Sequence, residues 1–149
     1  MLLRYKEKIL ASGLVLAALL FGSCDKSVSP KLERNSIYGT WRWLESIGGE
    51  GGVELTSESV GYNLFYVFKT DSTFELYKFQ PRGGRTLEYQ TKFWVTKEEW
   101  PTYPDSAEII HYADDNLIDQ RIEYAELGTI RLHDHQCVDC FVHTLVRIN

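Results

Sequence analysis

The stretch that decides the fold is TLEYQTKFWVT, residues 86–96, in which apolar and polar side chains alternate along the chain. Its first set is Leu87, Tyr89, Thr91, Phe93 and Val95, and Glu88, Gln90 and Lys92 stand between them. Because successive side chains of a β-strand point to opposite sides of the sheet, this period of two predicts a strand with one apolar and one solvated face.

Similar short segments rich in aromatic and β-branched residues lie on both sides, separated by turn-forming Gly, Pro, Asn and Asp. They predict eight strands, at residues 38–47, 62–69, 73–80, 86–96, 107–112, 116–123, 129–133 and 141–148. Eight antiparallel strands in up-and-down order close into a barrel whose interior holds side chains or one small ligand. The predicted fold class is all-β, with a single antiparallel barrel at residues 37–149.

The first 23 residues have the layout of a secretory signal peptide. Three basic residues in MLLRYKEK precede an apolar run at residues 9–21, and two small residues follow before Cys24. The run is shorter than the roughly 20 residues that a membrane-spanning helix needs. We therefore expect residues 1–23 to be removed.

The segment LFGSC, residues 20–24, resembles the lipobox of bacterial lipoproteins. The resemblance implies that Cys24 is acylated, becomes the mature N-terminus and attaches the protein to a membrane through its lipid. Polar residues 25–36, which include Pro30, predict a flexible tether, so that residues 24–36 form the lipidated cysteine and linker. The expected location is the bacterial cell envelope, at the outer or inner membrane; an ordinary cleavage site and an uncleaved anchor are the alternatives.

Charge and length limit the class of partner. The whole chain has 16 basic and 21 acidic residues, and removing a leader with three basic residues and one acid leaves a net charge of −7. Nucleic-acid binding depends on Lys and Arg at phosphates, so we expect no nucleic-acid partner. The remaining 126 residues are one domain's worth of chain.

Residues at both ends of the predicted barrel resemble those of bacterial lipocalin-like lipoproteins, which have calycin-type β-barrels. The matching stretches are Gly39-Thr40-Trp41 within YGTWRWLESIGGEGG, then SVGYNLFYVFKTDSTF and the final CVDCFVHTLVRIN. The resemblance covers most of residues 37–149. It implies a barrel that binds a small apolar ligand, and it implies that Arg147 packs across Trp41.

The stretch HDHQCVDCFVH gathers side chains that ligate zinc or copper, namely His133, His135, Cys137, Cys140 and His143. If even-numbered residues of both flanking strands face the core, His143 meets His133 or His135 on the outer face. The competing interpretation is a hairpin end closed by a Cys137–Cys140 disulfide, the default in an exported protein. We favour the disulfide over a metal site and over thiol redox chemistry.

Several aromatic residues could fill the core or line a cavity, and the sequence does not separate the two. We select Trp43, Tyr66 and Tyr89 as candidate ligand contacts. The glycine-rich residues 48–52 lack the residues of a phosphate-binding loop and predict a mobile connection between the first two strands that could cover one mouth of the barrel.

No catalytic motif is recognisable, so we expect no enzyme and no cofactor. The leading hypothesis is an envelope lipoprotein that binds a small, apolar molecule. The alternative is a ligand-free β domain that acts as an interaction or accessory module for another envelope protein.

Overall fold

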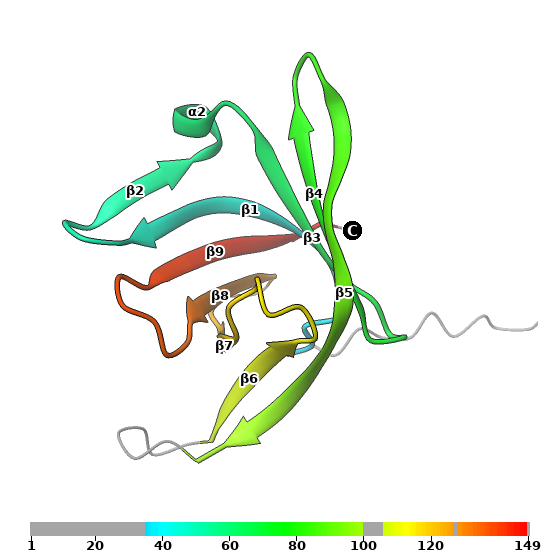
Figure 1. Ribbon diagram of the computed structural model, residues 1–149, viewed down its shortest axis with the longest axis vertical. Helices are drawn as coiled ribbons and strands as arrows, with labels where there is room; N and C mark the ends of the chain where they lie inside the picture. Colours follow the sequence, from blue (N-terminus) through cyan, green and yellow to red (C-terminus); the bar gives the residue numbers. More distant parts are fainter. Residues whose placement is uncertain (1–34, 100–105, 127, 149) are drawn as a thin grey trace, which may run out of the picture. The chain divides into compact units, whose positions relative to one another are not determined.

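A computed structural model describes residues 35–99, 106–126 and 128–148, which fall within one compact unit beginning at Glu33. Figure 1 shows a curved antiparallel sheet. Its elements are β1 (Gly39–Gly48), β2 (Val53–Thr56), α2 (Ser57–Val60), β3 (Asn63–Phe68), β4 (Thr73–Gln80), β5 (Gly84–Glu98), β6 (Ala107–Tyr112), β7 (Gln120–Tyr124), β8 (Thr129–Asp134) and β9 (Phe141–Ile148). The predicted signal peptide, Cys24 and the tether as far as residue 34 lie outside the described residues.

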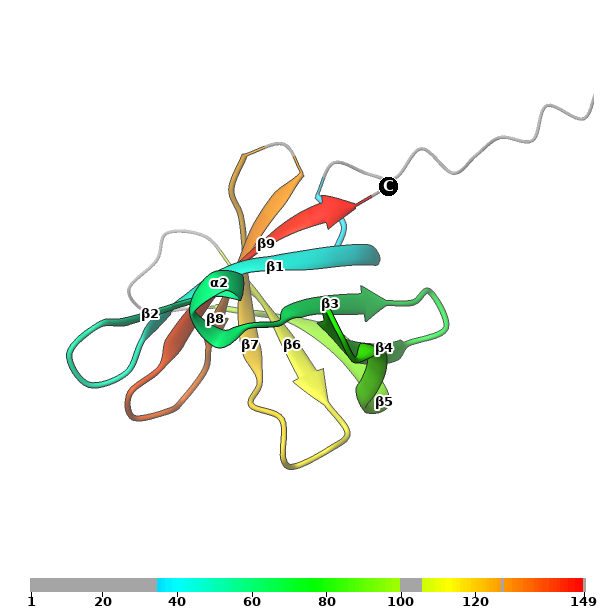
Figure 2. The same cartoon turned by 90° about the horizontal axis from the view of Figure 1, so that it is seen from above.

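The sheet closes on itself, which confirms the predicted eight-stranded antiparallel barrel. Each strand from β3 to β9 pairs with its neighbour in sequence, and β9 then pairs with β1 along nearly its whole length. Figure 2 shows β1 lying beside β9. The other edge of β1 is shared: Gly39–Arg42 pairs with β3, and Glu45–Gly48 pairs with β2. β2 is thus a ninth strand outside the closed barrel.

The sequence did not predict β2 or the short helix α2. A turn at residues 49–52, with positive φ at three glycines, joins β1 to β2, so the first connection leads to this added strand. Thr56 caps α2 through the backbone N–H of Ser59, and Gly61 ends the helix in the left-handed conformation. Four residues between two caps leave no helical periodicity to detect.

A bulge corrects the predicted faces of residues 86–96. Leu76 pairs with Tyr89, but the next residue of β4, Tyr77, pairs with Leu87, so Glu88 is the extra residue. Paired residues share a face of the sheet, so Leu87 and Tyr89 lie on opposite faces and not on one face as predicted. This part of β5 forms with β4 a long hairpin that projects past the neighbouring strands (Figure 1), and its side chains are exposed.

The register of β8 and β9 also differs from the prediction. Ile130 pairs with Leu145 and Leu132 pairs with His143, so odd-numbered residues of β9 share the inner face with even-numbered residues of β8. Leu145 is fully buried, whereas Ile148 is exposed. The expectation of an even-numbered inner face on β9 was therefore wrong, and His143 points inward, away from His133.

The core is an aromatic and aliphatic cluster along the barrel interior. Its fully buried members are Trp41, Phe68, Phe74, Phe93, Ile110, Ile130, Leu132 and Leu145. Phe68 lies 5.2 Å from Phe93 and 4.9 Å from Phe74 between ring centroids, so these three rings pack against one another in the core. None of the described helices is long and apolar enough to cross a membrane.

Candidate ligand-binding site

A cavity of about 210 Å³ lies in the barrel beside the β6–β7 loop and is partly open to solvent. Strands β3, β4, β6, β7, β8 and β9 and the β6–β7 loop line it, through Tyr66, Phe74, Leu76, Tyr112, Asn116, Leu117, Ile118, Gln120, Asp134 and His143. Its volume corresponds to about seven water molecules at ~30 Å³ each. The lining is mainly apolar with several polar groups, which makes the cavity a candidate binding site for a compact molecule.

A bulge in β1 builds one side of the polar region. Trp43 pairs with Leu145 and Glu45 pairs with Thr144, which leaves Leu44 as the extra residue. The bulge changes which residues face inward, so Trp43 and Ser46 both lie on the inner face although they are three residues apart. The indole Nε1 of Trp43 donates a hydrogen bond to Ser46 Oγ at 2.8 Å.

From Ser46 a series of hydrogen bonds runs along the inner wall of the barrel, over the neighbouring strands β1, β9 and β8. Ser46 Oγ lies 2.6 Å from His143 Nδ1, and His143 Nε2 lies 3.1 Å from Asp134 Oδ1. The Trp43 N–H can only donate, so Ser46 accepts from it and its hydroxyl proton is available for Nδ1. His143 Nε2–H then donates to Asp134, and every proton of the series has an acceptor.

Asp134 is the centre of the network. Its Oδ1 also accepts from Gln120 Nε2 at 2.9 Å, and its Oδ2 accepts from the backbone N–H of Phe141 at 3.2 Å. Burial by itself would raise the pKa of this carboxyl, but the hydrogen bonds from His143 and Gln120 outweigh burial and hold the pKa below its usual range. The carboxylate is therefore charged at neutral pH.

Tyr112 completes the network on the other side. Its hydroxyl donates to Gln120 Oε1 at 3.0 Å, so its oxygen still has lone pairs to accept a hydrogen bond. Burial, with the nearby Tyr66 and the carboxylates Asp119 and Asp134, raises the pKa of Tyr112 well above its usual range. The phenol therefore stays protonated.

Tyr66 differs from the other polar groups of the cavity because its hydroxyl has no protein partner among the described residues. The residue is only 8% exposed, and burial, with nearby Asp134, raises the pKa of its phenol well above the usual range. Among the described residues, every side-chain oxygen or nitrogen that is fully buried has a hydrogen-bond partner. The Tyr66 hydroxyl has none, so it is not fully buried and opens onto the cavity. The hydroxyl is thus placed to form a hydrogen bond with a molecule or with water in the cavity.

The three residues predicted as ligand contacts occupy different places. Tyr66 lines the cavity. Trp43 is buried beside it, where it supports Ser46 and stacks on Tyr62 at 6.4 Å between centroids. Tyr89 is 39% exposed on the projecting β4–β5 hairpin and does not line the cavity.

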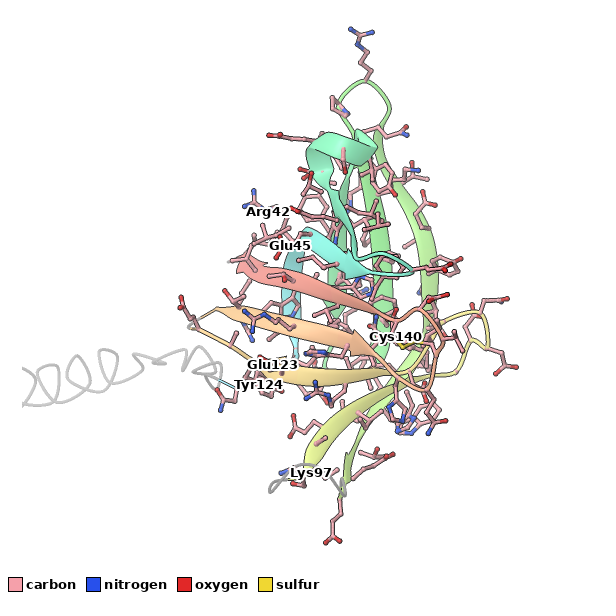
Figure 3. All side chains as sticks on the ribbon, turned by 90° about the vertical axis from the view of Figure 1, so that its left-hand side faces the viewer. Arg42, Glu45, Lys97, Glu123, Tyr124 and Cys140 are labelled. Carbon is pink, nitrogen blue, oxygen red and sulfur yellow. A yellow bond between two sulfur atoms is a disulfide. The ribbon has the colours of Figure 1, made fainter. Side chains whose placement is uncertain are left out.

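The histidines of HDHQCVDCFVH do not converge. His133 lies on the outer face, where its Nε2 is 2.7 Å from Glu123 Oε2, and Figure 3 labels Glu123 on β7. His135 borders a groove on the outside of the barrel, whereas His143 faces the interior. The described residues contain no group of three or more His, Cys, Asp or Glu side chains arranged to hold a metal ion.

The disulfide between Cys137 and Cys140 is present, and it closes the loop between β8 and β9. Figure 3 shows Cys140 in this loop. The loop packs against the end of β1, where a Cβ on Gly48 would lie 2.2 Å from the carbonyl oxygen of Cys140. Glycine at this position thus allows the loop to approach the strand that carries Ser46.

The residues of the Gly-x-Trp motif meet Arg147 at the opposite end of the barrel. The Arg147 guanidinium carbon lies 4.3 Å from the centroid of the Trp41 ring, and its nitrogens donate to the backbone carbonyls of Ser36 and Tyr38. Gly39 has φ of +138°, and a Cβ there would lie 3.2 Å from the guanidinium. Glycine and arginine together therefore fix where the chain enters β1.

A second hollow, of about 430 Å³, lies on the outer surface beside β5 and β6. Trp94 stacks on His111 there at 5.4 Å between centroids, and the ring nitrogens of His111 contact Asp119 at 2.7 Å and Thr96 at 2.8 Å. These polar groups satisfy one another. The interior cavity, with its unpaired hydroxyl, is the better candidate site.

Sequence reasoning missed Ser46, Tyr112 and Gln120, and it considered His143 only as a metal ligand. One signal was available. If Arg147 packs across Trp41, odd-numbered residues of the last strand face inward, and His143 is then an interior residue. The inward position of Ser46 could not be predicted in this way, because it depends on the bulge at Leu44, which no sequence pattern indicates.

No family model, curated protein or solved structure matches this chain. The closed eight-stranded barrel, an architecture consistent with a calycin-like fold, and its cavity are therefore the basis for assigning a function.

Proposed function

We propose that this chain is an envelope lipoprotein, anchored through Cys24, whose barrel binds one small molecule in the interior cavity. The observation that carries the proposal is the Tyr66 hydroxyl, which is buried, opens onto the cavity and lacks a protein partner among the described residues. Buried polar groups in folded proteins are almost always hydrogen-bonded. A ligand in the cavity would supply the hydrogen-bond partner that the Tyr66 hydroxyl lacks within the described residues.

The cavity favours a compact ligand with both polar and apolar parts over a long lipid chain. Its volume of about 210 Å³ is below the ~300–1,000 Å³ of typical pockets for drug-sized ligands. Phe74, Leu76 and Leu117 offer an apolar wall, and Asp134 faces it with a carboxylate. We therefore propose a partly polar ligand in place of the small apolar molecule expected from the sequence.

A binding role also fits the Ser46–His143–Asp134 chain better than catalysis does. These residue types form the triad of serine hydrolases, in which the serine oxygen must reach the substrate. Here Ser46 does not line the cavity, and its oxygen already accepts a hydrogen bond from Trp43. The hydrogen bonds from Ser46 through His143 instead hold the Asp134 carboxylate in place.

The cellular location rests on the sequence. The segment LFGSC ends in Cys24, and the Cys137–Cys140 disulfide suits an oxidising compartment. Labelling cells with a radioactive fatty acid tests the anchor: the wild-type chain should incorporate label and fractionate with membranes, whereas Cys24→Ser should do neither. Label that persists in Cys24→Ser would contradict the assignment.

Native mass spectrometry tests ligand binding. The full-length gene is expressed with export in a bacterial host, and the mature protein is purified in mild detergent and exposed to an envelope extract. We expect a retained organic mass that is lost on unfolding. Protein that carries no added mass under any extract would argue against a binding barrel.

A second candidate function, an interaction module, is favoured by the outer face of the β4–β5 hairpin. Phe79 is 40% exposed and Leu87 is 45% exposed there, beyond the body of the barrel. A photo-crosslinking residue at position 87 should give one discrete protein adduct in the envelope if this face binds a partner, and the same residue at the exposed position 86, which pairs with Lys78 on the opposite face, should not. Equal adduct patterns at both positions would remove this alternative.

A further inference from the structure

We propose that the interior cavity takes a compact cationic amine, whose ammonium group binds the Asp134 carboxylate and the hydroxyls of Tyr66 and Tyr112. This inference rests on the proposed function, because it names the class of ligand for the same cavity. Three properties of the lining carry it: its charge, its unused hydrogen-bonding capacity and its aromatic rings.

The described lining contains one carboxylate, Asp134, and the one basic side chain beside it is the imidazole of His143. Asp134 is ionised, and neither Lys nor Arg is among the lining residues that the structure describes. His143 Nε2 lies 3.1 Å from Asp134 Oδ1 and occupies that oxygen, whereas Oδ2 faces no charged group among the described residues of the lining. A buried carboxylate of this kind is stabilised by a cation brought by the ligand.

The remaining hydrogen-bonding capacity is mainly that of acceptors. Asp134 Oδ2 accepts from a single donor, the backbone N–H of Phe141, and a carboxylate oxygen can accept two. The Tyr112 hydroxyl already donates its hydrogen bond to Gln120, so its oxygen can only accept a further one. Tyr66 supplies a third oxygen. An ammonium group has three N–H donors and no acceptor, which matches this set.

Aromatic rings line the cavity next to these oxygens. Phe74 lies 5.0 Å from Tyr112 and 6.0 Å from Tyr66 between ring centroids. The faces of such rings attract cations. The apolar part of the amine would pack on Leu76 and on Leu117 of the β6–β7 loop.

An anionic ligand fits less well. It would meet the Asp134 carboxylate, and the chain as a whole has a formal net charge of −5, which draws cations toward it and repels anions. A neutral alcohol of the same shape would pair with the tyrosines but gain nothing from the charge. We therefore expect a cationic amine to bind most tightly, a neutral alcohol of the same shape less tightly, and an anion most weakly.

The test uses three probes that share one ring: benzylamine, benzyl alcohol and benzoate. Titration calorimetry of the mature protein at pH 7.5 and low salt should give the order benzylamine, benzyl alcohol, benzoate, with about tenfold or more between the first two. Benzyl alcohol or benzoate binding as tightly as benzylamine would overturn the amine assignment and leave the binding barrel in place. If no probe binds and the envelope extract gives no retained mass, both proposals fail.

Two variants locate the interaction. Asp134→Asn keeps the shape and should weaken benzylamine about tenfold or more while it changes benzyl alcohol less than about threefold. Asp139→Asn is the matched control, because Asp139 is exposed in the disulfide loop and its positive φ of 61° suits asparagine. Benzylamine binding unchanged in Asp134→Asn, or reduced equally in both variants, would overturn the proposal.

Tyr66→Phe keeps the proposal testable if Asp134→Asn does not fold. Tyr66 makes no hydrogen bond within the described part of the chain, so its loss should leave the fold intact. We expect benzylamine to bind about three- to tenfold more weakly. Unchanged affinity in a folded Tyr66→Phe would place the amine elsewhere.

Discussion

Two tyrosines of the cavity, Tyr66 and Tyr112, differ in one respect that stability measurements can detect. The hydroxyl of Tyr112 donates to Gln120, whereas that of Tyr66 has no partner among the described residues. Tyr112→Phe would leave Gln120 Oε1 unpaired in a residue that is 7% exposed, at a cost of about 1–3 kcal/mol. Tyr66→Phe removes only a hydroxyl that is itself poorly satisfied, so the free energy of unfolding should stay the same or rise by up to about 1 kcal/mol.

Urea unfolding followed by tryptophan fluorescence measures both variants against the wild type in the absence of ligand. The expected order of stability is Tyr66→Phe at or above the wild type, with Tyr112→Phe below both by at least about 1 kcal/mol. If Tyr66→Phe is as destabilising as Tyr112→Phe, the Tyr66 hydroxyl has a partner inside the fold. The reasoning that makes it a ligand contact would then be refuted.

Three further predictions concern other contacts. Arg147→Met removes the cation above Trp41 and two hydrogen bonds to backbone carbonyls, and it should lower the free energy of unfolding by about 2–4 kcal/mol in urea titrations; a loss under about 0.5 kcal/mol would contradict this. The pKa of Asp134 is lower in the fold than in the unfolded chain, so its charge stabilises the protein above pH ~3.9 and this contribution is lost as pH falls through the folded value. Asp134→Asn should therefore flatten the fall in stability below about pH 4, as measured by acid unfolding, and an unchanged slope would speak against it. Replacing Cys137 and Cys140 together by serine opens a short loop and should cost roughly 2 kcal/mol in thermal unfolding without loss of the barrel; collapse of the fold would show a larger role for the disulfide.

Much of the strand pattern could be predicted because it depends on neighbouring residues. The boundaries of β4, β6 and β9 match those expected, since short apolar segments between turn residues define them. Two elements could not be predicted in this way. β2 is only four residues long and forms by pairing with the end of β1, and β7 begins at Gln120 rather than at 116 because Asp114 and Asn116 hold a turn through their side chains.

The inner face of β9 shows how two inferences from one sequence can disagree. Alternation by itself allows either Val142, Val146 and Ile148 or Phe141 and Leu145 to face inward. The predicted contact of Arg147 with Trp41 implies the second choice, and the structure has it, with Leu145 buried and paired to Ile130. A strand with apolar residues on both faces needs its partner strands to decide its orientation.

The sequence by itself determined that the chain is a set of antiparallel strands, that Gly39 precedes a buried Trp41, and that Cys137 and Cys140 lie close enough to pair. These features depend on side-chain alternation, backbone freedom and short separation along the chain. Tertiary structure alone decided that the bulge at Leu44 turns Ser46 inward to meet His143, and that Asp134 and Tyr66 share one cavity. Those contacts join strands that are far apart in sequence, and one extra residue in a strand reverses which side chains meet, so only the closed barrel specifies them.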